Sequence, residues 1–471
     1  MNKQLLVSGF NLFHQIDFSD STRRFGFENF SPLKKNELSS SPSMAMTLNN
    51  SRSSLMSMMY GENIVNACGS LFYNMYLTNF GRLFVLGNFH ITDHEYVEFQ
   101  KESNNGFFLD DSARDFDNRM IVATTSYKRF YELSNHSSLI DSKIVQMACG
   151  RDFSLLLTQE GTVLAFGNNM NNQCAFPLSK TLSGRAYFPN QIQSPVQVLS
   201  RAVSVSCGQK HSIVLMNDRK TLITFGDNSY GQLGIGHLDS DPDRHFISLG
   251  EYMDSDDYIE KIECGGFHNI VLTRKGTVIL FGRGIEGQLG LKHSSSISKP
   301  TILNTFRENN LKVKSVACGE MHTLFLTYCG QVFACGSNYK GELGLGKHNS
   351  LVQHVTEPTK INFEKSIETI SCGSCHSLAV SRDGSHFAFG QNQEGQLAMK
   401  GGNRFEFLPK NISIESTEHL STSSLFSNSS CFCSFLVRGT ANTRLTEFFT
   451  KLTTSLNSHK AFADCTFTFE E

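Results

Sequence analysis

Short runs of β-branched and apolar residues recur along the 471-residue chain, in pairs separated by a polar turn that ends in glycine. Apolar residues at 270–272 and 278–281, for example, flank the turn Thr-Arg-Lys-Gly at 273–276. Runs of this length around a glycine predict a β-hairpin, because glycine readily adopts the positive φ that such a turn needs. Comparable turns stand at 78–81, 158–161, 327–330 and 381–384.

The hairpins belong to a repeat. A Cys-Gly pair begins at Cys68, Cys149, Cys207, Cys264, Cys318 and Cys372, and the last five pairs follow one another every 54 to 58 residues. Gly-x-Asn and Gly-Gln-Leu-Gly elements follow most hairpins. A period in this range indicates a propeller or a solenoid, and the lack of helical periodicity favours four short strands in each unit.

The combination Cys-Gly-x-x-His, Gly-x-Asn and Gly-Gln-Leu-Gly resembles the regulator of chromosome condensation repeat family. The resemblance implies an all-β fold, a seven-bladed β-propeller over residues 1–440. Six units are explicit, and a degenerate seventh near Ser429 aligns Cys433 with His376. That unit lacks its own Gly-x-Asn, whereas Gly9-Phe10-Asn11 stands alone at the N-terminus, so we expect N- and C-terminal strands to share one blade and close the ring.

Three segments do not follow the repeat. Residues 31–58 and 88–142 are polar and are interpreted as loop insertions in the propeller. Residues 441–471 predict a short helix, from the spacing of Leu445, Phe448, Phe449, Leu452 and Leu456, followed by an alternating strand at 463–469. This ending resembles the entry strand of a BTB domain.

Composition narrows the function further. The 42 basic and 44 acidic residues leave a net charge of −2, so direct, sequence-specific nucleic acid binding is not expected. The absence of Trp excludes repeats whose signature contains Trp, and the 39 Phe are expected to fill the large core positions. Without a signal-peptide or membrane-spanning pattern, we expect a cytoplasmic or possibly nuclear protein that does not bind membranes, with its 13 Cys reduced.

Several motifs suggest chemistry out of context. Cys372-Gly373-Ser374-Cys375-His376 matches the haem-attachment pattern, but Cys372 and His376 are also the repeat's own residues. His211, His268, His322 and His376 come from successive units, too far apart around a ring to share one metal ion. We interpret them as structural histidines bonded to neighbouring backbone.

The remaining motifs also have structural interpretations. Glycines 282, 284 and 287 match a dinucleotide fingerprint by letter but lie between predicted strands, so we interpret the segment as a blade turn. Asp254, Asp256 and Asp257 are expected in a solvated loop. Asn-x-Ser sequences begin at Asn135, Asn411 and Asn428, and matter only in a secreted protein. We therefore assign no catalytic, cofactor-binding or metal-binding residues and no cofactor.

These observations favour a non-enzymatic interaction scaffold whose propeller loops bind protein partners, in a ubiquitin-ligase or signalling context. The family resemblance adds an alternative, a guanine-nucleotide exchange factor, so a small GTPase or a cullin ubiquitin-ligase scaffold is a candidate partner. Exchangers of the Ran GTPase carry a basic tail and a wedge. Here residues 1–60 hold six basic and four acidic residues, and the nearest wedge candidate, 225–228, is an ordinary repeat motif.

Overall fold

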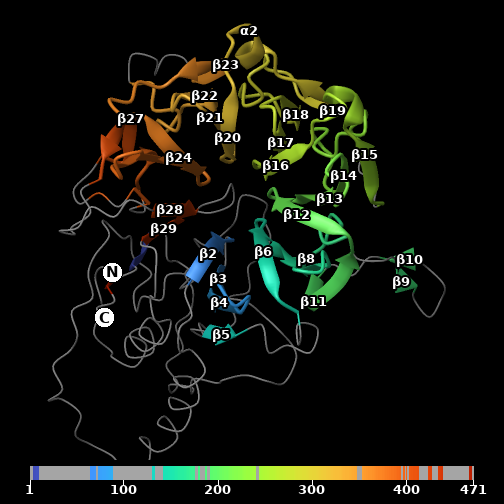
Figure 1. Ribbon diagram of the computed structural model, residues 1–471. Helices are drawn as coiled ribbons and strands as arrows, with labels where there is room; N and C mark the ends of the chain where they lie inside the picture. Colours follow the sequence, from blue (N-terminus) through green and yellow to red (C-terminus); the bar gives the residue numbers. More distant parts are fainter. Residues whose placement is uncertain are drawn as a thin grey trace, which may run out of the picture.

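The computed structural model is an all-β propeller (Figure 1). It describes residues 4–9, 64–70, 73–87, 130–132, 142–175, 179–180, 186–187, 191–239, 243–346, 353–393, 396–397, 399, 403–412, 423–426, 433–438 and 466–468. Within these residues the helices are short: the 3-10 helix η2 (Gly250–Tyr252) and α2 (Thr305–Glu308). No helix in this part of the chain is long and apolar enough to cross a membrane.

Six blades are each built from four strands that follow one another along the chain. The first three comprise β2 (Ile64–Gly69), β3 (Tyr73–Thr78), β4 (Leu83–Gly87) and β5 (Phe130–Glu132); β6 (Ile144–Cys149), β7 (Phe153–Thr158), β8 (Val163–Asn168) and β11 (Gln191–Leu199); and β12 (Ala202–Cys207), β13 (His211–Met216), β14 (Thr221–Gly226) and β15 (His245–Ser248). A two-stranded ribbon, β9 (Ser179–Lys180) and β10 (Ala186–Tyr187), precedes β11.

The next three blades repeat the pattern. They comprise β16 (Ile259–Cys264), β17 (His268–Thr273), β18 (Val278–Gly282) and β19 (Ile297–Ile302); β20 (Val313–Cys318), β21 (His322–Thr327), β22 (Val332–Ser337) and β23 (His354–Lys360); and β24 (Ile367–Cys372), β25 (His376–Ser381), β26 (His386–Gln391) and β27 (Phe405–Asn411). In Figure 1 the first strand of each blade, such as β12, β16 and β20, lies nearest the centre and the fourth lies outside.

The core lies between blades. All six residues of β17, β21 and β25 are buried, and one apolar cluster joins residues of β13 and β14 to residues of β16, β17 and β18. Because both faces of each sheet are covered by neighbouring sheets, the second and third strands are apolar almost throughout instead of alternating. This explains the apolar runs from which the hairpins were predicted.

The predicted glycine turns are confirmed. The hairpin glycines adopt positive φ, +82° at Gly161 and +91° at Gly276. The Gly-Gln-Leu-Gly glycines also permit a close approach between blades, because a Cβ built on Gly231 would lie 2.6 Å from Ser298 Cα of the next blade. A larger residue there would push the neighbouring outer strand away.

The two chain ends share a sheet, as predicted. In the composite sheet, β1 (Gln4–Gly9) lies between β29 (Cys433–Arg438) and β30 (Thr466–Thr468), and β28 (Ser423–Phe426) lies beyond β29. The register places Gly9 opposite Cys433, just as Gly390 is opposite His376 in the preceding blade. Strand β28 contacts β24 and β25, and β29 contacts β2, so the composite sheet lies between the last and the first of the six blades.

The first blade corrects one prediction. Its register pairs Tyr73 with Gly87 and Gly69 with Asn74, as Phe153 pairs with Gly167 and Cys149 with Ser154. The pair equivalent to Cys-Gly is therefore Gly69-Ser70, not Cys68-Gly69, and Tyr73 takes the place of the histidine. Tyr73 follows Gly69 by four positions, as Phe153 follows Cys149, so the turn has its usual length and the letters Cys-Gly lie one residue before the repeat position.

Other predicted segments are only partly described. The predicted insertion at 88–142 contains β5, which is the fourth strand of the first blade. The loop at 31–58 and the helix expected around 445–456 lie outside the described residues. Strand β30 lies within the predicted strand 463–469 and pairs with β1; the BTB assignment stays a prediction.

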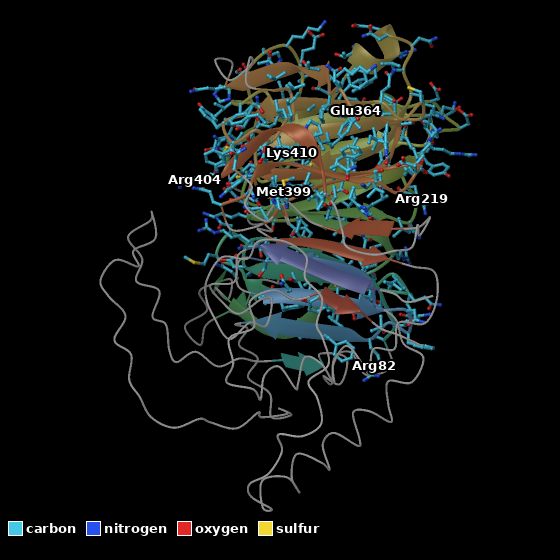
Figure 2. All side chains as sticks on the ribbon, turned by 90° about the vertical axis from the view of Figure 1, so that its left-hand side faces the viewer. Arg82, Arg219, Glu364, Met399, Arg404 and Lys410 are labelled. Carbon is cyan, nitrogen blue, oxygen red and sulfur yellow. The ribbon has the colours of Figure 1, made fainter. Side chains whose placement is uncertain are left out.

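The antiparallel order gives the ring two distinct faces. The loop face carries the Cys-Gly turns and the long loops between third and fourth strands. The hairpin face carries the hairpin turns, such as 216–221, and the connections between blades. Figure 2 shows the ring from its edge, with Met399 and Arg404 of a long loop on one side and Arg82 and Arg219, at hairpin turns, on the other.

Candidate interaction surfaces

The repeat histidines link consecutive blades. Each reaches the polar residue that follows the histidine of the next blade: His211 Nε2 lies 2.7 Å from Asn269 Oδ1, His268 Nε2 lies 3.0 Å from Thr323 Oγ1, and His322 Nε2 lies 2.9 Å from Ser377 Oγ. For these three histidines the predicted partner, neighbouring backbone, was wrong. In the first blade, the Tyr73 hydroxyl makes the equivalent bond of 2.7 Å to Ser154 Oγ.

The polar residue that each histidine reaches donates a hydrogen bond back to the blade that carries the histidine, so the two bonds form a relay. Asn269 Nδ2 donates to Gln232 O, Thr323 Oγ1 to Gln288 O, and Ser377 Oγ to Glu342 O, each at 2.8 Å. Because the hydroxyl protons of Thr323 and Ser377 are committed to these carbonyl oxygens, the histidines must donate from Nε2. The relay therefore requires a proton on Nε2 of the histidine.

Burial favours the neutral state of the repeat histidines. It lowers the pKa of His211 to about 4 and the pKa of His268, His322 and His376 to about 3. Among the described residues, Nδ1 of His211 and of His268 has no hydrogen-bond partner, so a second ring proton would be buried without an acceptor. A histidine in this position fills space and donates one hydrogen bond.

The same packing explains the glycine of Cys-Gly. A Cβ built on Gly208, Gly265, Gly319 or Gly373 would lie 2.0 Å from Cε1 of its own blade's histidine. The ring thus occupies the volume of the missing side chain. In the first blade Ser70 stands in this position, and its Oγ accepts a hydrogen bond of 3.1 Å from the Tyr73 backbone N–H.

The two cysteines of the haem-attachment pattern, Cys372 and Cys375, have different surroundings. Cys372 is buried, with its Sγ 4.0 Å from Ser377 Oγ, whereas Cys375 Sγ lies 3.1 Å from Lys340 Nζ, a residue of the preceding blade. Burial raises the pKa of the Cys375 thiol to about 11. The ten described Cys are free thiols, and no group of three or more metal-ligating side chains occurs in the described part of the chain.

The fingerprint-like segment is a blade loop, as predicted. It connects β18 to β19, and Arg283 Nε donates to Glu286 Oε2 at 2.9 Å while its guanidinium lies 4.7 Å from the Tyr230 ring centroid. Tyr230 in turn packs on Phe267, with ring centroids 5.5 Å apart. These side chains contact one another across two neighbouring blades, so the loop has a structural role in holding the blades together.

The loop face has a rigid frame and exposed apolar side chains. Backbone N–H groups of Arg151, Gln209, Gly266 and Glu320 each donate to the equivalent turn of the next blade, at 2.9 to 3.2 Å. Met170, Ile285 and Tyr339, each third after its strand's glycine, are 46% to 52% exposed. The frame therefore presents one large apolar side chain from each of three blades.

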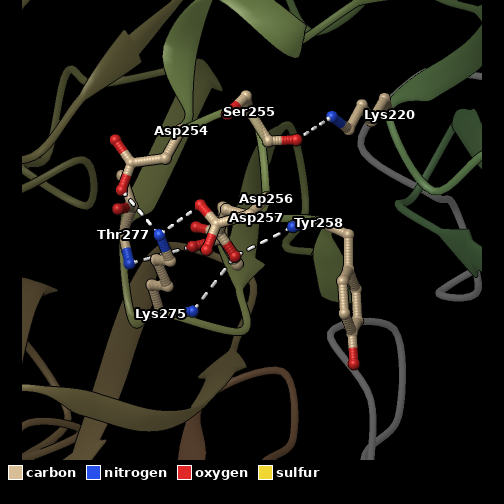
Figure 3. Close-up of polar contacts among 9 residues, drawn as sticks. Lys220, Asp254, Ser255, Asp256, Asp257, Tyr258, Lys275 and Thr277 are labelled. Carbon is tan, nitrogen blue, oxygen red and sulfur yellow. Dashed lines mark hydrogen bonds and ion pairs between the residues drawn. The ribbon is translucent and has the colours of Figure 1, made fainter.

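The hairpin face carries a charged cluster around the connection between β15 and β16 (Figure 3). Lys275 Nζ contacts the carboxylates of Asp254 and Asp256. Asp257 is only 2% exposed, and its Oδ1 accepts from the backbone N–H of Tyr258 at 2.8 Å and of Lys275 at 3.2 Å. The predicted solvated loop is thus correct for Asp254 and Asp256 but wrong for Asp257, which holds the connection against the hairpin.

Tyr258 lies beside this cluster with an arginine from each of two blades on its ring. The guanidinium carbon of Arg219 lies 5.5 Å from the ring centroid and that of Arg274 lies 5.6 Å from it. Sequence analysis missed this group. The available signal was the hairpin 216–221, which has arginine where the other hairpins have glycine.

Comparison with known proteins agrees with the fold. The family model described as the RCC1-like domain matches residues 53–431. This match spans most of the chain, and the chain belongs to this family.

Two human proteins resemble the chain in sequence. The protein named probable E3 ubiquitin-protein ligase HERC6 is 31% identical over 263 residues, which cover 54% of this chain and 24% of HERC6. An RCC1-like G exchanging factor-like protein is 28% identical over 328 residues, which cover 55% of this chain and 70% of that protein. The chain thus matches about a quarter of the ligase.

Among solved structures, Prp20p from Saccharomyces cerevisiae, a protein studied for its binding to Gsp1p and histones, superposes with a TM-score of 0.63. The two chains are 16% identical, and the superposition covers 96% of this chain and 95% of Prp20p. At this identity the likeness shows a common fold.

Proposed function

We propose that the chain is a seven-bladed scaffold that binds protein partners without catalysing a covalent reaction. The composite sheet would be the seventh blade, since it contacts the blades on both of its sides and repeats their strand register. The HERC ligase and the exchange-factor relative both contain a segment similar to this chain, in proteins with different named activities. This variety favours partner binding as the role of the propeller.

The observation that carries the proposal is the set Met170, Ile285 and Tyr339 on the loop face. Large apolar and aromatic side chains that project from a rigid frame are typical of the few residues that dominate protein interfaces. Because inter-blade hydrogen bonds hold the frame, little conformational entropy is lost when a partner binds. The loop face is therefore the proposed partner-binding surface.

The test compares partner recovery by matched variants. The double variant Ile285→Asp and Tyr339→Asp places charges on the loop face, whereas Phe246→Asp changes a residue that is 71% exposed on the outer strand β15. In quantitative affinity purification, we expect the double variant to recover partners in amounts at least about tenfold lower than wild type and Phe246→Asp do. Equal recovery by all three forms would contradict binding at the loop face.

The second candidate function is nucleotide exchange on a small GTPase. The exchange-factor relative and the fold shared with Prp20p support it. Catalytic amounts of the chain would accelerate nucleotide release from at least one GTPase in a panel, and no acceleration would leave the scaffold function. A cullin ubiquitin-ligase scaffold is the corresponding candidate partner if the chain recruits substrates.

A further inference from the structure

Arg219, Tyr258 and Arg274 form a basic clamp on the hairpin face. Both arginine side chains are exposed, and both guanidinium groups lie within cation–π distance of the one tyrosine ring. Arg219 comes from the β13–β14 hairpin, and Arg274 from the β17–β18 hairpin of the next blade. The clamp therefore spans the joint between two blades.

The backbone holds the three residues in place. The backbone N–H of Ile259 donates to Arg219 O at 2.9 Å, and the backbone N–H of Arg274 donates to Tyr258 O at 3.0 Å. Asp257 Oδ1 also accepts from the Tyr258 backbone N–H. These bonds set the backbone from which the two arginine side chains extend, and the Tyr258 ring contacts both guanidinium groups.

Arg219 occupies this place at a conformational cost. Its φ is +53°, whereas the equivalent residues of the other hairpins are glycines, among them Gly161, Gly276 and Gly330. A left-handed conformation is unfavourable for arginine by about 1 kcal/mol and free of that cost for glycine. Strain of this kind persists where a side chain serves another purpose.

The nearby acids are committed to other groups. Asp218 Oδ1 accepts from the backbone N–H groups of Lys220 and Thr221, both at 2.9 Å, and its Oδ2 accepts from the Thr221 hydroxyl at 2.6 Å. Asp254 and Asp256 contact Lys275 Nζ. Among the described residues, no carboxylate forms an ion pair with Arg219 or Arg274.

We propose that this clamp binds an acidic segment of a partner protein, with a carboxylate received between the two guanidinium groups. Guanidinium groups match the geometry of a carboxylate. The Asp256 carboxylate lies within electrostatic range of Arg274 but is held by Lys275, so both guanidinium groups keep their donors available to a ligand. The segment would bind on the hairpin face, opposite the surface proposed above, so either surface can exist without the other.

The test measures binding of the full chain to a fluorescein-labelled peptide of alternating glutamate and glycine, by fluorescence anisotropy. Arg219→Gly restores the hairpin glycine and removes one guanidinium, so the melting temperature should stay equal or rise while the association constant falls about five- to tenfold. Arg274→Gln should lower the association constant by a similar factor. In Arg219→Gly, a weaker association constant with an unchanged or higher melting temperature would separate the effect on binding from any effect on folding.

Arg382→Gln is the matched control. Arg382 has the same hairpin position as Arg274 in another blade, but its Nε lies 3.4 Å from Glu368 Oε2. The substitution removes the same charge from the same face, and the association constant should stay within about twofold of wild type.

The proposal is overturned if wild type does not bind the peptide, if Arg219→Gly binds as tightly as wild type, or if Arg382→Gln weakens binding equally. It is also overturned if a single-stranded oligothymidylate of equal charge binds in an Arg219-dependent manner while the glutamate peptide does not. That result would assign the clamp to nucleic acid.

Discussion

The blade β20–β23 and the composite sheet β28-β29-β1-β30 have the same register but differ in connectivity. In the blade, His322 pairs with Gly336 across a hairpin of consecutive residues. In the composite sheet, Cys433 pairs with Gly9, more than 400 residues away in the chain. The blade repeats a histidine relay, whereas the composite sheet has cysteine where the histidine stands.

This comparison shows which features the strand register requires. Neither the hairpin connection nor the histidine is needed for the strand register, because the composite sheet has it without either. What the two sheets share is a glycine opposite the residue that begins the second strand. In β22 this glycine, Gly336, has a φ of +111°, and a Cβ there would lie 2.7 Å from His322 Cα. The same close approach occurs at Gly167, Gly226, Gly282 and Gly390, in four other blades.

Removing the N-terminal strand should have the largest effect. Deletion of residues 1–15 removes β1 and leaves β29 without its neighbour on one side, which exposes a sheet edge. We expect loss of cooperative thermal unfolding or aggregation, measured by calorimetry and light scattering. Deletion of residues 463–471 removes only β30, the edge strand of the same sheet, and should leave cooperative unfolding intact. An unchanged melting temperature in the first variant would refute closure by the chain ends.

Gly319→Ala tests the packing within a blade of consecutive strands and should have an intermediate effect. The new Cβ would lie 2.0 Å from His322 Cε1, and the ring is held by its bond to Ser377. We expect about 2–3 kcal/mol lower free energy of unfolding in urea. Gly250→Ala is the control, because its nearest atom would be Ser248 Oγ at 3.8 Å. Equal stability of the two variants would contradict the packing role of the histidine ring.

A fall in pH from 7 to 6 should have the smallest effect and should act through the histidine blades. The folded-state pKa of the four repeat histidines is about 3 to 4, below the unfolded value of about 6.5. Their stabilisation is complete above pH 6.5 and is lost as pH falls toward 3. Each histidine contributes a slope of at most about 1.4 kcal/mol per pH unit.

Glu342 partly offsets this slope. Burial raises its pKa to about 7, so its contribution decreases as pH rises from 4.5 to 7. Because four histidines oppose one glutamate, unfolding in urea should require less denaturant at pH 6 than at pH 7. A midpoint that is the same at both pH values would show that the histidines are not buried as neutral groups.

The repeat made much of the fold predictable. Turn glycines such as Gly276 and the pairing of Gly9 with the last unit followed from local chemistry and from counting units. The partner of His211 was not predictable, since Asn269 lies 58 residues away and only the angle between blades brings the two side chains together. The first blade was misaligned because its Cys68-Gly69 letters lie one residue before the repeat position, which the strand register assigns to Gly69-Ser70.

The candidate surfaces were also predictable only in part. The sequence indicated loops that could bind partners, and the missing glycine in the hairpin 216–221 was visible in it. That Arg219 and Arg274 lie on one tyrosine ring depends on how two blades join.

By itself, the sequence determined a ring of repeated four-stranded units closed by both chain ends, because turn glycines and apolar runs act over a few residues. Only the tertiary structure decided which side chains link the blades, which acids are already paired and which arginines are left to bind. Those outcomes depend on distances between residues that are far apart in the chain, and such distances exist only once the blades have packed.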